Sequence, residues 1–599
     1  MFSIRPLPRD SIIVPPGSIA AAAPPRRWQT ALAARLAMTA ALGMAMAQGF
    51  PARAQTAVQP AAASVGVDSL ALGSGVVELF INGVPVPTPT PDAGSDWVEL
   101  VRANLVEGDN MIAVRAQRGL DRVPYAVARL YGDFGFVNSS GFWSAKAATA
   151  DSESTGAGAW TSLAYDDGTW AKATVVADSA WGAGPRGGLQ AIWTANSADE
   201  TALLRLKFHL PPGLNAAKPV GFGQGVTGGL GGEEVTVGTP EELAYALCHT
   251  KDSKGFCTDA TPRIITVDST IDFTGREGLD SVLACKQSLC TAPTPVQLRI
   301  NVDNSCAVGS TFLGSIDAAG RRPLAVGSNK TLIGVENNAI IKGKGLTLMG
   351  KVSNIIIRNI SITDINPQYI WGGDAITVND ASDVWIDHNY FARIGRQMIV
   401  TGADGPARNV TISWNEFDGK SAYSAYCDGN HYWNLLMLGL NDTITFSNNY
   451  IHNTSGRAPH AGGLFNATVA MQIANNYFEN LSQEGASNPR TPLVHLLIEG
   501  NYYKNVPITV YIKSNQPGYA WAPAVSMSPE NDALCISSLG RSCVLNGAAP
   551  MPTSRYSSWP MDKEVMSRFS TTPPGAVVAP YKAENVPNAV PHLSGVGHL

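Results

Sequence analysis

The chain is 599 residues long, 45% hydrophobic and only 15% charged, and it contains 59 glycines. This length exceeds one ordinary domain, and this composition excludes a chain that is disordered throughout. The formal net charge of −5 argues against nucleic acid as a general partner. It also excludes indiscriminate attraction to a polyanion, unless the protein has a local basic groove.

Residues 1–54 are predicted to be a signal peptide. Arg26 and Arg27 precede the apolar run "ALAARLAMTAALGMAMA", and small-residue cleavage patterns follow it. The run contains an arginine and is short for a membrane span, so a membrane anchor is the weaker alternative. Cleavage after Ala54 would remove six Arg and one Asp and take the formal charge from −5 to −10. We therefore expect a secreted, extracellular protein that has no membrane contact after cleavage.

Residues 65–212 are predicted to form a β-sandwich, followed by a linker at 213–220. Short alternating runs such as "VVELFING" and "NMIAVRA" are separated by turn residues. The segments "FINGVPV", "NLVEGDNMIAVRA", "YDDGTWAKAT" and "LLRLKFHLP" resemble the galactose-binding-like module of bacterial polysaccharide enzymes. The six tryptophans from Trp97 to Trp193 have two interpretations. They pack in the core of the sandwich, or some of them stack on sugar rings and provide a second polysaccharide contact.

A repeat begins at about residue 330. The segments "NIIIRNISI", "VWIDHNYF", "VTISWNEF", "ITFSNNYI", "AMQIANNYF" and "LLIEGNYY" share an apolar alternation followed by an asparagine. These asparagines are Asn359, Asn389, Asn415, Asn449, Asn476 and Asn501, at steps of 30, 26, 34, 27 and 25 residues. This period predicts a solenoid. We expect an all-β protein with a right-handed parallel β-helix over 221–515 and a C-terminal cap or tail over 516–599.

The repeated asparagine is predicted to occupy a tight bend between strands. Asparagine tolerates left-handed backbone there, and its amide can stack on the same side chain of the next rung. The longer steps of the repeat indicate insertions on one face, which in solenoids often form the binding surface.

Several motifs follow one another on successive rungs: "IIKGKGL", "TDINPQYIWGGDAIT", "VWIDH", "ARIGRQ", "YCDGNHYW" and "HNTSGRAPH". Together they resemble the pectin lyases of polysaccharide lyase family one, especially the fungal type, over Gly221–Lys513. The resemblance implies a polysaccharide lyase that acts as a monomer on cell-wall pectin. It would cleave α-1,4-linked methyl-esterified galacturonan by β-elimination.

The resemblance implies three catalytic residues. Arg457 matches the arginine that accepts the C5 proton, Arg396 matches a cleft arginine that replaces a carboxylate of the calcium-binding relatives, and Asp374 matches a further active-site residue. An arginine of pKa ~12.5 costs about 7.5 kcal/mol to deprotonate at pH 7, and a neighbouring cation lowers this cost. We therefore expect Arg396 to supply positive charge in place of calcium and Asp374 to orient Arg396 or a substrate hydroxyl.

The carboxylates near these motifs do not indicate a catalytic metal. Asp380 and Asp383 are expected in a solvated turn, and Asp387 with His388 is interpreted mainly as a structural motif. Such carboxylates can bind calcium, but because Arg396 lies among them we expect no metal ion or other cofactor at the catalytic site.

Aromatic residues beside the motifs are predicted to bind substrate. Trp371, Tyr432 and Trp433 would line a cleft suited to neutral methyl esters, with core packing as the alternative. His460 stands where relatives often have lysine, and Ala458 stands where they often have serine. His460 is therefore a candidate substrate contact that adjusts the pH optimum or the handling of partly de-esterified chains.

The eight cysteines are even in number and none forms a paired CxxC motif, which favours disulfides over zinc in an exported chain. The resemblance implies the pairs Cys285–Cys306 and Cys290–Cys427. The spacing of Cys535 and Cys543 makes a short disulfide loop plausible, which leaves Cys248 and Cys257 for each other.

Three other functions compete with a pectin lyase. A hydrolase on the same solenoid needs two or three close carboxylates, and no such pair is visible on the strands. A calcium-dependent pectate lyase would need a carboxylate cluster that holds the ion. A non-catalytic wall-binding protein would not need Arg457, Arg396 and Asp374 on their motifs.

Overall fold

The computed structural model describes residues 62–67, 74–86, 98–118, 123–132, 135–149, 159–177, 190–211, 214, 216–287, 295–335, 337–464, 466–483, 485–512 and 517–599. The chain divides into two compact units, Met1–Gln59 and Pro60–Leu599. The predicted signal peptide lies outside the described residues. Within the described ranges, no helix combines the length and the apolar character that a membrane crossing requires.

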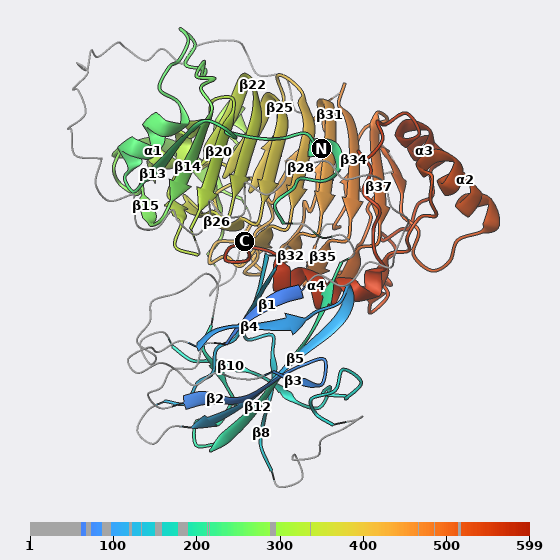
Figure 1. The fold of residues 1–599 in the computed structure, drawn as a ribbon. Coiled ribbons are helices and arrows are strands. Elements are labelled where there is room, and N and C mark those ends of the chain that lie inside the picture. The colour runs from blue at the N-terminus through green and yellow to red at the C-terminus, as the bar shows by residue number, and fades with distance from the viewer. Residues whose placement is uncertain are drawn as a thin grey trace. The chain divides into compact units, whose positions relative to one another are not determined.

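The first part of the second unit consists of antiparallel β-sheets (Figure 1). One sheet contains, in order, β3 (Val84–Val86), β2 (Ser74–Ile81), β5 (Gly108–Arg118), β12 (Thr201–Leu210), β8 (Ser144–Ala147) and β9 (Ala171–Lys172). A second contains β4 (Val98–Asn104), β1 (Ala62–Val67), β6 (Arg129–Gly132) and β7 (Gly135–Asn138), and a pair is formed by β10 (Thr174–Val175) and β11 (Ile192–Trp193).

Three of the tryptophans in this sandwich are in its core. Trp143, Trp160 and Trp193 are 1%, 5% and 1% exposed, and the indole of Trp143 donates to the carbonyl of Asn138. Trp97 and Trp181 lie outside the described residues. Core packing therefore accounts for at least three of the six tryptophans, and the sugar contact stays a prediction for the module.

The rest of the chain is a parallel β-helix. Its longest sheet contains β13 (Glu233–Val237), β14 (Arg263–Val267), β20 (Lys330–Gly334), β22 (Leu346–Arg358), β25 (Ile376–Asp387), β28 (Ala407–Ser413), β31 (Leu440–Ser447), β34 (Thr468–Ala474), β37 (Val494–Glu499) and β39 (Tyr519–Trp521). A second sheet contains β15 (Thr270–Asp272), β21 (Ile340–Lys342), β23 (Ser361–Ile365), β26 (Tyr390–Ile394), β29 (Glu416–Asp418), β32 (Tyr450–His452), β35 (Tyr477–Glu479), β38 (Tyr502–Lys504) and β40 (Gly547–Ala549).

A branch of the longest sheet forms a further face. It starts at the N-terminal halves of β22 and β25, which are long strands. The other branch strands are β19 (Leu324–Ala325), β27 (Ile399–Thr401), β30 (Leu435–Met437), β33 (His460–Ala461) and β36 (Asn488–Pro489). Asp380 and Asp383 have φ of 53° and 56° inside β25, where the strand turns from the branch to the longest sheet. The turn expected at these two residues is thus present as bends within a continuous strand, and both side chains are half-buried.

The core is built from side chains that stack from rung to rung. Ile357, Ile386, Ile412 and Phe446 occupy paired positions on β22, β25, β28 and β31 and are fully buried. Phe391 stacks on Phe417 with ring centroids 5.0 Å apart. One inward position thus repeats along the axis, which is how a solenoid buries a continuous core from short strands.

The predicted asparagine stack is present, but its first and last members differ from those expected. The side chain oxygen of each asparagine accepts hydrogen bonds from the backbone and side-chain nitrogens of the preceding one, from Asn389 to Asn501. Asn546 continues the stack. Asn359 is not a member, because Ile360 occupies the equivalent position and donates to Asn389.

The left-handed bend lies one residue before each stacked asparagine. His388, Trp414, Asn448, Asn475 and Gly500 all have φ between 51° and 67°. Asn359 has φ of 54° and shares this position. The amide stacking expected from the sequence is therefore confirmed, whereas the expectation that the same asparagine adopts the left-handed conformation is wrong.

Helices close the ends of the β-helix (Figure 1). α1 (Pro240–Leu247) begins with a capping box between Thr239 and Glu242 and buries Leu243 and Leu247 in the core. α2 (Pro529–Leu539) and α3 (Lys563–Phe569) share a hydrophobic cluster with β37 and β39. α4 (Val586–Leu593) joins a cluster that contains sandwich residues and Trp414. The segment 516–599 is thus more regular than the sequence indicated, since β39 and β40 extend the rungs.

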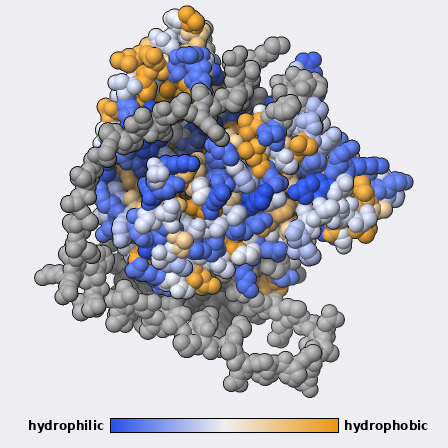
Figure 2. Space-filling view, turned by 90° about the horizontal axis from the view of Figure 1, so that it is seen from above, coloured by the Kyte–Doolittle hydropathy of each residue, from blue (hydrophilic) through white to orange (hydrophobic). Residues whose placement is uncertain are grey.

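A separate four-stranded sheet is formed by segments between the strands of the β-helix. It contains β18 (Phe312–Asp317), β16 (Leu279–Lys286), β17 (Leu298–Ile300) and β24 (Tyr369–Ile370). Disulfides join Cys285 with Cys306, Cys248 with Cys257 and Cys535 with Cys543, as expected. Cys290 lies outside the described residues, so its pairing with Cys427 stays a prediction. On the face in Figure 2, hydrophilic residues are interspersed with smaller hydrophobic patches.

Candidate active site

The residues that precede the branch strands form a row along the β-helix. Each branch strand pairs in parallel register with the next one, so equivalent residues line up from rung to rung. Two positions before the paired residues lie, in rung order, Arg322, Lys344, Asp374, Gln397, Trp433 and Arg457. Neighbouring strands lie about 4.8 Å apart, so this row extends for about 24 Å. Two of the predicted catalytic residues belong to it, and Arg396 directly precedes Gln397.

Arg396 and Asp374 form a largely buried ion pair. Nη1 of Arg396 lies 3.1 Å from Oδ2 of Asp374, and each side chain is 17% exposed. Oδ1 of Asp374 accepts from the backbone N–H of Gln397 at 2.7 Å, which fixes the loop that carries Arg396. Asp374 thus contacts Arg396, and its expected role in orienting Arg396 or a substrate hydroxyl stays a prediction.

The charge of Arg396 is influenced by burial and by two neighbours. Burial lowers its pKa, Asp374 raises it, and the nearby positive charge of Arg457 lowers it again, with a net lowering. The guanidinium also lies 3.9 Å from the ring centroid of Trp371. Because the charge of Arg457 lowers the pKa of Arg396, the two arginines are close enough to repel each other electrostatically.

Arg457 is held in a buried loop from which its side chain emerges. Ser455, Gly456 and Ala458 are buried, whereas Arg457 is half-buried and has φ of 52°. Its carbonyl accepts from the N–H of Leu435 at 2.7 Å, and the carbonyl of Gly456 accepts from the side chain of Asn434 at 2.8 Å. Small buried neighbours and a hydrogen-bonded backbone therefore hold Arg457 in a fixed position.

Aromatic rings surround the side chain of Arg457. Its guanidinium carbon lies 4.6 Å from the ring centroid of Trp433 and 5.5 Å from that of Tyr432. The two rings meet edge to face, with centroids 4.8 Å apart. Trp371 is 38% exposed, whereas Tyr432 is 7% exposed. Trp371 is thus exposed and Tyr432 is buried, and the predicted substrate contact of Trp371, Tyr432 and Trp433 stays a prediction.

His460 lies on the same rung as Arg457, three residues further along the chain. It is the first residue of β33, is half-buried and pairs with Leu436 and Asn488 in the sheet. This position is compatible with a substrate contact beside Arg457, and that role stays a prediction.

Three residues that the sequence did not single out contact the loops of the candidate site: half-buried Asp428, and the buried His431 and Gln297. Asp428 accepts hydrogen bonds from the hydroxyls of Ser424, Ser455 and Ser482 and from the N–H of Asn430. Ser455 lies two residues before Arg457. Burial raises the pKa of Asp428, but these hydrogen bonds more than offset it and leave the pKa below its usual value. Asp428 therefore ties the Arg457 loop to two other loops.

The other two supporting residues are His431 and Gln297. Nε2 of His431 lies 2.7 Å from the carbonyl of Arg396 and 3.0 Å from that of Trp433, so it donates to both. Burial lowers the pKa of His431, which keeps the ring neutral. Gln297 accepts from the indole of Trp433 and donates to the carbonyl of Gly395. The motif "CDGNHYW" contained Asp428 and His431, but only the folded structure shows what they contact.

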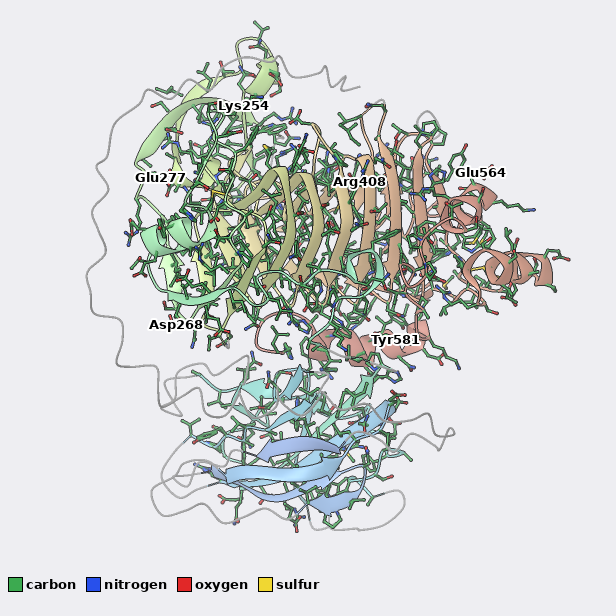
Figure 3. The ribbon with its side chains drawn as sticks, turned by 45° about the horizontal axis from the view of Figure 1, so that its top comes forward. Lys254, Asp268, Glu277, Arg408, Glu564 and Tyr581 are labelled. Carbon is green, nitrogen blue, oxygen red and sulfur yellow. A yellow bond between two sulfur atoms is a disulfide. The ribbon has the colours of Figure 1, made fainter. Side chains whose placement is uncertain are left out.

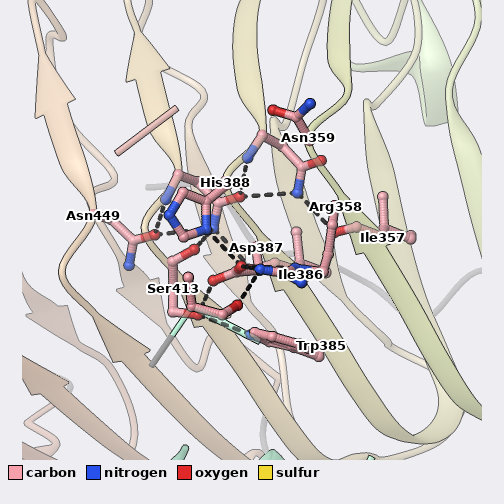
Figure 4. Close-up of polar contacts among 12 residues, drawn as sticks. Ile357, Arg358, Asn359, Trp385, Ile386, Asp387, His388, Ser413 and Asn449 are labelled. Carbon is pink, nitrogen blue, oxygen red and sulfur yellow. Dashed lines mark hydrogen bonds and ion pairs between the residues drawn. The ribbon is translucent and has the colours of Figure 1, made fainter. Parts of the chain in front are cut away.

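Asp387 and His388 lie at the other end of β25 from Asp374. Asp387 is fully buried and accepts from Arg358 at 2.9 Å, from His388 Nδ1 at 2.6 Å and from Ser413 at 2.6 Å (Figure 4). Burial raises its pKa, but the charges of His388 and Arg358 outweigh burial and lower the pKa overall. This network supports the structural interpretation of the two residues.

The donor set around Asp374 does not fit calcium. Ca²⁺ requires six to eight oxygen ligands, several of them carboxylates. Both oxygens of Asp374 already accept hydrogen bonds, and the guanidinium of Arg396 lies against them. Across the described ranges, no group of three or more His, Cys, Asp or Glu side chains is arranged to hold a metal ion.

Comparisons with known proteins agree on one family. The family model described as pectate lyase matches residues 212–567. The chain is 38% identical over 386 residues to "Probable pectin lyase F" of Neosartorya fischeri, which covers 64% of this chain and 95% of that protein. It is 41% identical over 332 residues to "Pectin lyase D" of Aspergillus niger, which covers 55% of this chain and 82% of the relative.

Solved structures also match the β-helix. A pectate lyase from Xanthomonas campestris is 19% identical, with a TM-score of 0.38 and coverage of 63% of this chain and 98% of that one. A pectate lyase from Acidovorax avenae is 17% identical, with a TM-score of 0.39 and coverage of 65% and 96%.

Proposed function

This chain belongs to the pectate lyase family, and from that membership we propose that it cleaves methyl-esterified galacturonan by β-elimination. It is a polysaccharide lyase of the kind that acts on pectin or pectate. The finer assignment is carried by one observation: the guanidinium of Arg457 lies against the rings of Trp433 and Tyr432, on the row that also carries Asp374 of the Arg396–Asp374 ion pair.

In the proposed reaction, neutral Arg457 removes the C5 proton of the uronate unit next to the cleaved bond. The electron pair of the C5–H bond forms the C4–C5 double bond, and the C4–O bond breaks. The leaving oxygen takes a proton from water, and protonated Arg457 gives its proton to the hydroxide that remains. The products are a saturated end and an unsaturated end, and Arg457 is neutral again. The enolate-like charge that develops at the methyl ester requires a nearby positive group, and Arg396 supplies it.

The division of roles between the two arginines follows from their partners. A carboxylate stabilises a guanidinium as a cation, and Arg396 has one in Asp374. Among the described residues no ion pair joins Arg457 to a carboxylate, and its positive charge acts on that of Arg396. Removing a proton from Arg457 relieves repulsion, whereas removing one from Arg396 would break an ion pair.

Secretion forms part of the proposal. Three disulfides among the described residues fit an oxidising compartment, and the N-terminal run has the composition of an export signal. The sandwich module is proposed to add a second polysaccharide contact.

The test measures ultraviolet absorbance of unsaturated product from highly methylated pectin and from polygalacturonate, each with calcium and with chelator. We expect product from methylated pectin that survives the chelator. Arg457→Lys should lower kcat by about 10²–10⁴-fold, the usual contribution of a general base. Arg408→Lys is the matched control, because Arg408 is exposed on β28 (Figure 3).

Two results would redirect the assignment. Product only from polygalacturonate with calcium would mean that Arg396 does not replace a metal ion, and the chain would then be a calcium-dependent pectate lyase. No product from either polymer would favour a non-catalytic wall-binding protein.

A further inference from the structure

A cavity of about 250 Å³ lies at the end of the β-helix that carries α1. Ala244 and Cys248, at the end of α1, form one wall, and the segment around β19 forms another. Its charged lining residues are Lys251, Glu277, Arg322 and Lys344. Glu277 is labelled at this end of the β-helix in Figure 3.

The cavity has more positive than negative groups. Lys344 is anchored inside it, since its side chain is 6% exposed and its ammonium contacts Glu277. Arg322 bonds to Asp280 at 3.0 Å and approaches Glu277 at 3.6 Å, yet its side chain is 54% exposed. Lys251 is exposed at the rim. The lining thus contains three cations and one carboxylate, Glu277, which contacts Lys344 and Arg322. Arg322 and Lys251 are exposed and remain accessible to a ligand, although Arg322 also pairs with Asp280.

Two lining residues of the cavity belong to the row that carries the candidate active site. Arg322 and Lys344 occupy its first two rungs, and Asp374 follows on the third. Arg457 lies four rungs beyond Lys344, which corresponds to about 19 Å. A polymer that follows this row from Arg457 would thus reach the cavity after several sugar units.

The two ends of the row differ in chemistry. Trp371 and Trp433 present ring faces near Arg457, which suits uncharged methyl esters. The cavity presents an arginine and a lysine, which suit a carboxylate. The chain as a whole has a net charge of −5, whereas the cavity lining is locally positive and would attract a polyanion electrostatically.

We propose that this cavity is a distal subsite for the free carboxylate of a non-esterified uronate unit. The inference rests on the proposed function for its substrate, and it adds a preference: methylated units at Arg457, with a free carboxylate several units away. Arg322 and Lys251 would bind the carboxylate, and Lys344 with Glu277 would hold the floor of the cavity.

The test compares Arg322→Ala, Lys251→Ala and the wild-type protein on pectins of equal length that are highly or half methylated. For each variant we expect KM on half-methylated pectin to rise about five- to tenfold, with kcat unchanged, as for one lost charge-assisted contact. KM on highly methylated pectin should stay within about twofold, and the difference should shrink at high salt. Arg321→Ala is the matched control, because Arg321 is an exposed neighbour outside the cavity.

Binding provides a readout that does not depend on catalysis. Calorimetric titration of the wild-type protein with a non-esterified galacturonate oligomer should show binding that Arg322→Ala abolishes and Arg321→Ala retains. Equal KM changes on both pectins, or equal effects of the two arginine variants, would overturn the subsite. Absence of product with retained Arg322-dependent binding would contradict the proposed activity while supporting the subsite.

Discussion

Replacement of Asp387 by asparagine tests whether the network in Figure 4 is structural. The substitution keeps the shape of the side chain and removes its charge. Arg358 then loses a carboxylate that contacts it at 2.9 Å inside the protein. Breaking a buried ion pair from one side typically costs about 3–5 kcal/mol.

The lower part of this range applies to Asp387→Asn. Arg358 keeps its contact with the carbonyl of Ala216, and its guanidinium lies 4.2 Å from the ring centroid of Trp385. Asparagine can still accept one hydrogen bond, from Ser413 or His388. We therefore expect a loss of about 3 kcal/mol in the free energy of unfolding at pH 7.

Urea unfolding at several pH values measures this effect. The pKa of Asp387 is lower in the folded than in the unfolded protein, so its ionisation stabilises the fold above the unfolded pKa. That contribution is lost as the pH falls through the folded pKa. The stability difference between wild type and variant should thus be full at pH 7 and shrink below pH ~4.

Kinetic measurements and a control variant distinguish a structural role of Asp387 from a catalytic one. Asp383→Asn is the control, because Asp383 is half-buried on the same strand and contacts Ser382 and Asn409 without an ion pair in the described structure. At a temperature where both variants are folded, kcat and KM of Asp387→Asn should match wild type. A loss of kcat without a loss of stability would refute the structural interpretation.

Two further substitutions have effects of known direction. Burial raises the pKa of Asp442 to about 6, so ionisation of Asp442 destabilises the fold as the pH rises above the unfolded pKa. Asp442→Asn should therefore increase the free energy of unfolding by up to ~3 kcal/mol at pH 7 and leave it unchanged near pH 4. Urea unfolding at the two pH values measures this difference. Equal changes at both pH values would contradict this. Asp428→Asn loosens the Arg457 loop and should lower kcat about tenfold with KM within twofold, whereas Asp428→Glu should recover part of kcat. A change confined to the melting temperature would show that Asp428 has no positioning role.

The sequence predicted the solenoid because its signal is local and periodic. Each rung repeats an apolar alternation and an asparagine, and the asparagine stack exists from Asn389 to Asn546. The first repeat was misaligned by one residue, because Asn359 occupies the left-handed position that His388 or Gly500 takes elsewhere. Composition alone cannot separate these two adjacent positions, since asparagine is suited to both.

The supporting residues of the site were not predictable in the same way. Asp428 contacts Ser482, which is 54 residues away, and Gln297 contacts Trp433 across 136 residues. The row from Arg322 to Arg457 has irregular spacing, because loops of different length separate the branch strands. Only the parallel register of those strands shows that the cavity residues Arg322 and Lys344 lie in the same row as Arg457.

In the proposed function, the two arginines would let one site bind a neutral ester and still stabilise negative charge. Arg396 is fixed by Asp374 and lies on Trp371, so its charge is in place before substrate binds. Arg457 lies against Trp433 and has, within the described ranges, no hydrogen-bond partner for Nε. Aromatic faces stabilise a cation less than a carboxylate does, and they also suit methyl esters. The same rings can thus position the substrate and leave Arg457 without the partner that would hold its proton.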